Sequence, residues 1–349
     1  MKKILLKLKS TLFWKYLLIM IIIPTYKILW EYVINFEGKI LYLFKIKTKK
    51  DFKNFSLKKN DKFLVIQNPD FLDIAETINK NLSEDFLEIM RKKMNKIERP
   101  KDHYLHKKKN YKINMFPFLN ENTQKKILSF ALSEKNIIFV SKYLKVAPVI
   151  SSIYVNLNVP VKDRKERGPM LWHKDDFGFK SLDIFLPLKN MNINSGPLHY
   201  VKEKNNLGVF HKYLGALINP KKGERNKIDI NIFEDKSFDK IEKFIGKTGD
   251  AIYIDSFSCY HRGGYCVSEE RLMLRITYQT PDSISLSNNE IIRGLDEKIK
   301  KEFKVKNDYL SNYILFKRNF MFNYLSIQKL LLNFYKLLHY KDALLINKQ

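Results

Sequence analysis

The stretch PMLWHKDDFGFKSLDIFLPL, residues 169–188, joins a polar cluster to an apolar run. Its first half places His173, Asp175 and Asp176 within four residues, and its second half is rich in Leu, Ile and Phe. Apolar runs of this length, bounded by turn residues, are typical of buried strands. At this point three interpretations of the polar cluster stay open: a metal site, a solvated turn, or a group of salt bridges.

The composition around this stretch is that of a globular protein. The chain has 349 residues, of which 45% are hydrophobic and 13% are aromatic, so it can bury a sizeable core. The formal net charge is 64 − 37 = +27, and such an excess usually indicates nucleic acid or an anionic membrane as the partner. However, the lysines are spread along the whole chain, and no nucleic-acid-binding motif accompanies them. We therefore expect no nucleic-acid partner.

Cysteine usage indicates a reducing compartment. Cys259 and Cys266 allow one disulfide at most, so we expect a cytoplasmic protein, either free or peripheral to the inner face of the membrane. Together with His261 they form a Cys-x-His-x4-Cys pattern, which does not fit the spacing of structural zinc sites.

The chain divides into four segments by its pattern. Residues 1–50 are basic and amphiphilic, and residues 51–145 have mainly helical spacing, clearest at 71–94 and 121–144. Asn122 or Thr123 is the predicted N-cap of the second helical stretch, and residues 62–67 are a predicted early strand. Residues 146–285 hold the β-type runs, and residues 286–349 return to helical spacing, most clearly at 322–340. The β-type runs are 151–159, 182–188, 196–201, 250–255 and 271–280, and their spacing predicts an antiparallel sandwich or barrel.

The N-terminal segment contains an apolar run at 16–23 with aromatic residues at its borders. This run is too short to span a membrane, which needs about 20 apolar residues. Two interpretations stay open: residues 1–36 lie on an anionic membrane surface, or the segment forms helices that pack on the main domain. The oligomeric state is unknown from the sequence.

Residues at alternate positions of a strand share a face, so His173 and Asp175 can bind one metal ion together. The best candidate for a third ligand is His261, in GDAIYIDSFSCYHRGG at 249–264. Two histidines and one carboxylate leave open coordination positions, as in the non-haem Fe(II) oxygenases, where a 2-oxo acid and O₂ bind. Asp176 points to the opposite face and is interpreted as a turn residue.

The far carboxylate of a 2-oxo acid requires a cationic partner, and arginine is suited to it because its guanidinium is always charged and binds a carboxylate in a bidentate manner. Arg271 and Arg275 follow His261 on one apolar run and are four positions apart, so both point to the same face of a regular strand. Tyr154 and Asn156 also share a face on an earlier run, so both could reach 2-oxoglutarate or substrate. Ordinary buried hydrogen bonding is an equally good interpretation of these two residues.

Three motifs between residues 145 and 282 resemble the phytanoyl-CoA dioxygenase family of Fe(II)/2-oxoglutarate-dependent oxygenases. They are WHKD at 172–175, LDIFLPLKNMNINSGPLHYVKEKN at 182–205, and TGDAIYIDSFSCYHRGG at 248–264 followed by RLMLRITY at 271–278. Their order and spacing agree with the family, although they cover less than half of the chain. The end of the second motif departs from the Gly-Ser-His that is usual in the family.

This resemblance implies an α+β fold with a double-stranded β-helix core, a cupin-like jelly roll, flanked by N- and C-terminal helices. It implies His173, Asp175 and His261 as ligands of Fe(II), and Arg271 or Arg275 as the partner of 2-oxoglutarate, with Arg271 at the better-matching distance from His261. The implied activity is a dioxygenase that uses O₂ and 2-oxoglutarate, releases succinate and CO₂, and hydroxylates or otherwise oxidises a small organic substrate, free or lipid-linked. The presence of Asp175 favours hydroxylation over halogenation.

Further residues are assigned to the substrate pocket or to the core. Trp172, Lys180 and Cys259 are candidates for the pocket, whereas packing in the core or exposure on the surface would equally explain them. His199 is interpreted as a strand residue near a turn. Two alternative functions are a jelly-roll binding module without turnover and a protein that acts at the membrane surface.

Overall fold

The computed structural model describes residues 32–50, 63–95, 111–160, 170, 180–201, 241–257, 259, 261–283, 292, 295–306 and 308–317. The predictions made for residues 1–31, for Trp172, His173 and Asp175, and for the helix at 322–340 lie outside this part of the chain.

Helices and strands alternate in blocks along the described residues. The α-helices are α3 (Phe36–Leu41), α4 (Pro69–Asn81), α5 (Glu84–Asn95), α6 (Glu121–Ala131), α7 (Glu134–Leu144), α10 (Glu297–Lys306) and α11 (Tyr309–Phe316), with a π-helical turn η1 (Tyr42–Ile46) and 3₁₀ turns η2 (Phe116–Phe118) and η4 (Ile193–Ser195). The strands are β1 (Phe63–Gln67), β2 (Lys112–Asn114), β3 (Val149–Asn158), β4 (Ser181–Pro187), β5 (Leu198–Val201), β6 (Ile241–Phe244), β7 (Asp250–Ile254), β8 (His261–Gly263) and β9 (Arg271–Gln279).

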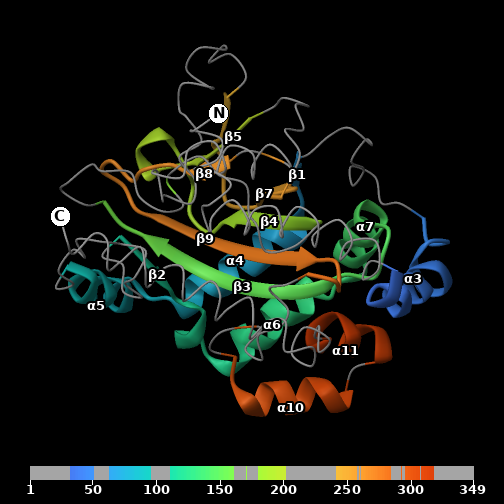
Figure 1. The fold of residues 1–349 in the computed structure, drawn as a ribbon. Coiled ribbons are helices and arrows are strands. Elements are labelled where there is room, and N and C mark those ends of the chain that lie inside the picture. Colours follow the sequence, from blue (N-terminus) through green and yellow to red (C-terminus); the bar gives the residue numbers. More distant parts are fainter. Residues whose placement is uncertain are drawn as a thin grey trace, which may run out of the picture.

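The strands form two antiparallel sheets, which confirms the α+β class. Within the described residues, the large sheet has the order β1-β7-β4-β9-β3-β2, and the small sheet has the order β6-β5-β8. Figure 1 shows α4 and α6 on one side of the large sheet, and β5 and β8 on the other side. The chain passes repeatedly between the sheets, because β4, β7 and β9 belong to the large sheet while β5, β6 and β8 belong to the small one.

The main core lies between the large sheet and the helices. Helix α4 begins at Pro69, after the N-cap Asn68, and buries Phe71, Ile74 and Ile78, which recur at helical spacing. Alternate residues of β9, including Leu272 and Leu274, belong to the same apolar cluster. The face of β9 with these even-numbered residues is therefore the helix side of the sheet.

A second, smaller core lies between the two sheets. It joins side chains of β4, β7 and β9 to side chains of β5 and β6: Phe185, Ile252, Ile254 and Met273 from the large sheet, and Leu198, Tyr200 and Phe244 from the small one. Strands β4 and β7 are consequently buried on both faces.

The structure confirms the predicted strands at 62–67, 151–159, 182–188, 196–201, 250–255 and 271–280, and the predicted helical stretches at 71–94 and 121–144. The predicted N-cap at Asn122 or Thr123 is wrong. Helix α6 begins at Glu121, and the side chain of Asn120 accepts a 2.8 Å hydrogen bond from the amide of Thr123. Asn120 takes this role because it provides an acceptor three residues before that amide.

Close backbone packing at Gly264 holds the end of β8 against the residues before β5. The Gly264 amide donates a 2.8 Å hydrogen bond to the carbonyl of Pro197. A Cβ atom on Gly264 would lie 2.4 Å from this carbonyl oxygen and 2.8 Å from the carbonyl carbon of Gly196. Since both neighbours are backbone atoms, a side chain cannot be accommodated there without moving one of the two segments.

We therefore predict that Gly264→Ala lowers the free energy of unfolding by about 1–3 kcal/mol, because the methyl group forces β8 away from Pro197. Urea denaturation followed by circular dichroism measures the change. Val305→Ala is the control: Val305 is exposed on α10, and surface substitutions of this kind change stability by about 0.5 kcal/mol or less. Equal stability of Gly264→Ala and the unmodified protein would contradict the tight packing.

Candidate functional site

His261 lies at the start of β8 and faces the interior between the sheets. It is directly opposite Tyr200 of β5, which belongs to the inter-sheet core, and only 3% of its surface is exposed. Its Nδ1 lies 3.0 Å from the carbonyl oxygen of Cys259. A carbonyl can only accept, so Nδ1 carries the proton in this hydrogen bond. In a neutral histidine with this hydrogen bond, Nε2 is the atom that binds a metal ion.

The inner face of β9 carries both predicted arginines. Arg271 and Arg275 alternate with Met273, which belongs to the inter-sheet core, so all three side chains point toward the small sheet. The prediction that both arginines share one face of the strand is therefore correct. The environments of the two guanidinium groups nevertheless differ.

Arg275 is paired with a buried carboxylate. Its Nε and Nη2 donate to the two carboxylate oxygens of Asp183 on β4, at 3.1 and 3.0 Å, and Asp183 is fully buried. The Thr277 hydroxyl also donates to Asp183, and the guanidinium lies over the ring of Phe185, 5.1 Å from its centroid. The charge of Arg275 is thus neutralised by the protein itself.

Arg271 has no such partner. Its guanidinium makes no hydrogen bond or ion pair with the part of the chain that the structure describes, although the residue is only 9% exposed. It lies opposite Asn158 of β3, and burial lowers the pKa of its guanidinium. A buried guanidinium without an anion is costly, so this position favours an anionic ligand.

Tyr154 and Asn156 lie on the same inner surface, on β3. Tyr154 is opposite Arg275 and is half-buried, and Asn156 is opposite Met273 and is buried. The side-chain oxygen of Asn156 has no hydrogen-bond partner among the described residues. Both residues are therefore placed beside the two arginines, and the Asn156 amide is available to a ligand.

Of the three residues assigned to a substrate pocket, Cys259 and Lys180 lie in the described part of the chain. Cys259 lies in the bend before β8, belongs to the inter-sheet core, and its thiol donates to the carbonyl of Val201 at 3.4 Å. Lys180 is exposed immediately before β4. Trp172 lies outside the described residues, as do His173 and Asp175. Consequently, no group of three or more metal-ligating side chains occurs within the described residues.

Asp183 was missed in the sequence, whereas His199 lies in β5, as predicted, beside cationic neighbours that the sequence did not reveal. Asp183 was included in a buried strand without a role, although an acidic residue within LDIFLPL was a signal that a cation lies nearby. His199 lies in one cross-strand row with Lys243 and Arg262. Burial, together with the charges of Arg262, Lys243 and Arg271, lowers the pKa of His199 to about 4, so its imidazole is neutral at pH 7 and adds no charge of its own.

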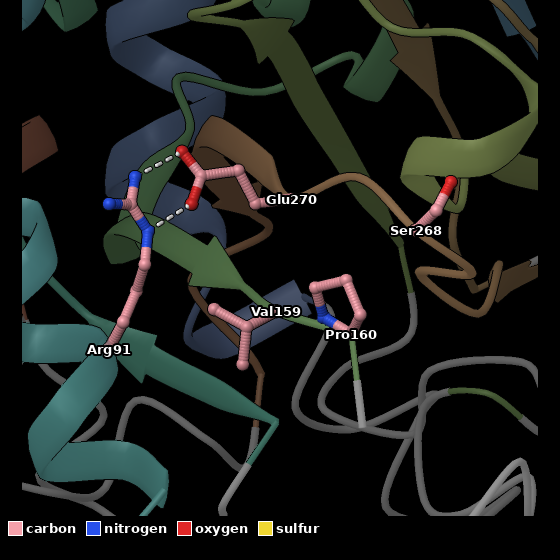
Figure 2. Close-up of a pocket in the computed structure, with 5 residues that line it drawn as sticks. All are labelled: Arg91, Val159, Pro160, Ser268 and Glu270. Carbon is pink, nitrogen blue, oxygen red and sulfur yellow. Dashed lines mark hydrogen bonds and ion pairs between the residues drawn. The ribbon is translucent and has the colours of Figure 1, made fainter. Parts of the chain in front are cut away.

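A cavity of about 320 Å³ lies where β3 ends and β9 begins. Figure 2 shows its lining residues: Arg91, Val159, Pro160, Ser268 and Glu270. Arg91 donates two hydrogen bonds to the Glu270 carboxylate, at 2.7 and 2.9 Å, and Lys189 donates a third at 2.8 Å. None of the predicted site residues lines this cavity. However, its ion pairs hold Glu270 in place directly before Arg271, which fixes the start of β9.

Comparison with known proteins gives no matching family model and no matching curated protein. Several solved structures are similar. AviO1 from Streptomyces viridochromogenes Tue57 is 13% identical and covers 64% of this chain and 91% of its own, with a TM-score of 0.39. The alpha-ketoglutarate-dependent epimerase SnoN from nogalamycin biosynthesis is 14% identical, with coverages of 64% and 80% and a TM-score of 0.39. HygX from Streptomyces hygroscopicus, with nickel and 2-oxoglutarate bound, is 12% identical, with coverages of 63% and 83% and a TM-score of 0.38. Because these similarities are low, we base the function on the residues of this chain.

We predict that Asp183→Asn lowers the free energy of unfolding by about 3 kcal/mol, because it leaves the part-buried Arg275 without its counter-ion. Chemical denaturation at pH 7 measures the loss. Glu88→Gln is the matched control, because the exposed Glu88–Lys92 pair has the same charges at the surface, where a pair contributes about 1 kcal/mol or less. Equal effects of the two substitutions would show that the Asp183–Arg275 pair is not effectively buried.

Proposed function

We propose that this protein is an Fe(II)- and 2-oxoglutarate-dependent dioxygenase of the phytanoyl-CoA dioxygenase type. The observation that carries the proposal is the position of Arg271. It is a buried guanidinium without an anionic partner among the described residues, on a face that points toward the sheet in which His261 is buried. A dicarboxylate that binds a metal at one end and Arg271 at the other would provide the missing charge.

The strand order supports a double-stranded β-helix as the core of this fold. In the large sheet, β3, β9, β4 and β7 are consecutive neighbours, and in the small sheet β8, β5 and β6 are. A jelly roll places four strands against four, and the three strands of the small sheet within the described residues would then be joined by a fourth beside β8. The segment between β3 and β4, which contains His173 and Asp175, is available in the chain order for this position. We propose that it brings these two residues to His261.

The donor set in this proposal fits iron. Two imidazoles and one carboxylate are the ligands of non-haem Fe(II) sites, and the hydrogen bond from Nδ1 of His261 to the Cys259 carbonyl already selects the tautomer that such a site needs. When bound, Fe(II) with 2-oxoglutarate and O₂ supplies the oxidising chemistry, in which 2-oxoglutarate becomes succinate and CO₂ and one oxygen atom enters the substrate.

The remaining residues would bind, orient and exclude water. Arg271 would hold the far carboxylate of 2-oxoglutarate, and the Asn156 amide, which can turn to present either its oxygen or its NH₂ group, would contact the same ligand. Arg275 is occupied by Asp183 and would act as a fixed part of the wall. Phe185, Met273 and Leu198 form an apolar lining between the sheets that would keep water from the reacting groups.

The substrate in this proposal is a small organic molecule, free or lipid-linked. Within the described residues, the structure contains no helix that is long and apolar enough to cross a membrane. The cytoplasmic location stays a prediction.

We predict that the purified protein with Fe(II) and O₂ converts 2-oxoglutarate to succinate even without its substrate, as a slow uncoupled reaction. His261→Ala should reduce succinate formation by about 100-fold or more, because it removes one of three metal ligands. Succinate is measured by mass spectrometry, and chelation followed by addition of Fe(II) should abolish and restore its formation. Val305→Ala is the control with unchanged turnover. Iron binding without any succinate would favour a binding module instead.

We also predict that Arg271→Leu weakens the binding of 2-oxoglutarate by about 100-fold, since a bidentate charged contact is lost, while Arg271→Lys restores part of it. Calorimetric titration with 2-oxoglutarate, with Mn(II) in place of iron, gives the dissociation constants without turnover. If Arg275→Leu weakened binding and Arg271→Leu did not, the two arginines would have the opposite roles.

A further inference from the structure

An exposed apolar surface occurs on the N-terminal helical segment, away from the candidate site. We call it the α3 apolar face, and it comprises Tyr32, Val33, Phe36, Ile40, Leu43 and Phe44. Phe36 is 63% exposed and Phe44 is 78% exposed. Single exposed apolar residues are common on protein surfaces, but six within one short segment form a contiguous patch of the kind that marks an interaction site.

Local geometry brings several of these side chains together. Phe36 and Ile40 are four residues apart in α3 and therefore share a side of it, Leu43 and Phe44 follow in the π-helical turn η1, and Tyr32 is held beside α3 by its contact with Lys39. The opposite side of the same segment is apolar as well, because Ile34, Leu41 and Ile46 are buried against the domain. The segment thus carries apolar side chains on two sides, and the described structure covers only one of them.

The buried side fixes the segment firmly to the domain. The carbonyl of Gly38 accepts a hydrogen bond from the amide of Ala147 at 2.9 Å, and the side chain of Asn35 accepts one from the amide of Asp282 at 3.0 Å. A Cβ atom on Gly38 would lie 2.7 Å from the side chains of Val146 and Tyr313, so the helix approaches its neighbours closely. The α3 apolar face is therefore presented outward by a fixed helix, at the edge of the molecule (Figure 1).

The charges around this face are positive. Residues 32–50 contain five lysines and a single acidic residue, Glu37, whose carboxylate is paired with Lys317. Lys45, Lys47 and Lys50 are exposed beside the apolar side chains, and Lys39 lies over the ring of Tyr32, 4.7 Å from its centroid. Aromatic and aliphatic residues flanked by lysines are the composition of helices that lie in the interface of anionic membranes.

We propose that the α3 apolar face docks the protein on the surface of an anionic lipid bilayer. The aromatic side chains enter the boundary between headgroups and acyl chains, and the lysines contact the lipid phosphates. A second copy of the chain is a poorer partner, because each copy carries a net charge of +27 and the lysines of the two faces would repel one another.

The first experiment places a polarity-sensitive fluorophore at position 44 through Phe44→Cys in the full-length protein. Cys259 and Cys266 are each 3% exposed, so the new thiol is labelled selectively. On addition of phosphatidylcholine vesicles with about 30 mol% phosphatidylglycerol, emission should shift to the blue. It should shift far less with phosphatidylcholine alone. The same label at Val305→Cys, exposed on α10 among lysines, is the control and should not shift.

The second experiment measures co-sedimentation of the unlabelled protein with the same vesicles. Phe36→Ser/Phe44→Ser should weaken partitioning by about tenfold or more, because two apolar side chains no longer leave water, and Val305→Ser should have no effect. Unchanged partitioning of the double variant would overturn the proposal, since the membrane contact would then lie elsewhere in the chain. Blue emission from position 44 before vesicles are added would equally overturn it, because the chain itself would cover the face. A fall in molecular mass of the double variant by light scattering would assign the face to a second copy.

Discussion

The burial of a guanidinium group within an otherwise apolar sandwich is the constraint around which the rest of this structure is arranged. Strand β9 carries two guanidinium groups on one face, the buried one of Arg271 and the part-buried one of Arg275, and their surroundings differ. Asp183 and Arg275 satisfy each other across β4 and β9, so their cost of desolvation is offset within the fold. Arg271 has no equivalent carboxylate in the described residues, although the ion pairs of Glu270 hold the strand firmly just before it. A guanidinium that is rigidly held, buried and without a balancing negative charge is suited to bind an anionic ligand rather than to stabilise the fold.

Local periodicity predicted much of this arrangement. The alternation of side chains in a strand depends only on neighbouring residues, so the common face of Arg271 and Arg275 could be read from RLMLRITY without knowledge of the fold. The helices at 71–94 and 121–144 were equally accessible, because their apolar spacing extends over several turns. By contrast, β2 and β8 have three residues each and β6 has four, and such short runs repeat the two-residue strand period too few times to be distinguished from loop sequence.

What the sequence could not predict depends on register between distant segments. Asp183 reaches Arg275 because Phe185 is the residue opposite Arg275 in the pairing of β4 with β9, and nothing local specifies that pairing. The hydrogen bond from His261 to Cys259 is local, but it depends on a bend at Cys259 that a strand pattern does not predict. The choice between the two arginines was therefore open in the sequence. In the structure, Arg275 is already paired with Asp183, which favours Arg271 as the arginine that binds 2-oxoglutarate.

The α3 apolar face and Arg271 lie at opposite ends of the large sheet. Helix α3 is hydrogen-bonded to residues just before β3 and just after β9, whereas Arg271 begins β9 opposite the last residue of β3. The eight residue-to-residue steps of extended strand from Arg271 to Gln279 span about 27 Å. A bilayer in contact with α3 would thus leave the Arg271 end of the sheet uncovered, so that docking would change the concentration of a lipid-linked substrate near the protein without closing access to the proposed site. In this proposed arrangement, the N-terminal segment would determine where the protein acts, and the inner face of the large sheet would determine what it binds.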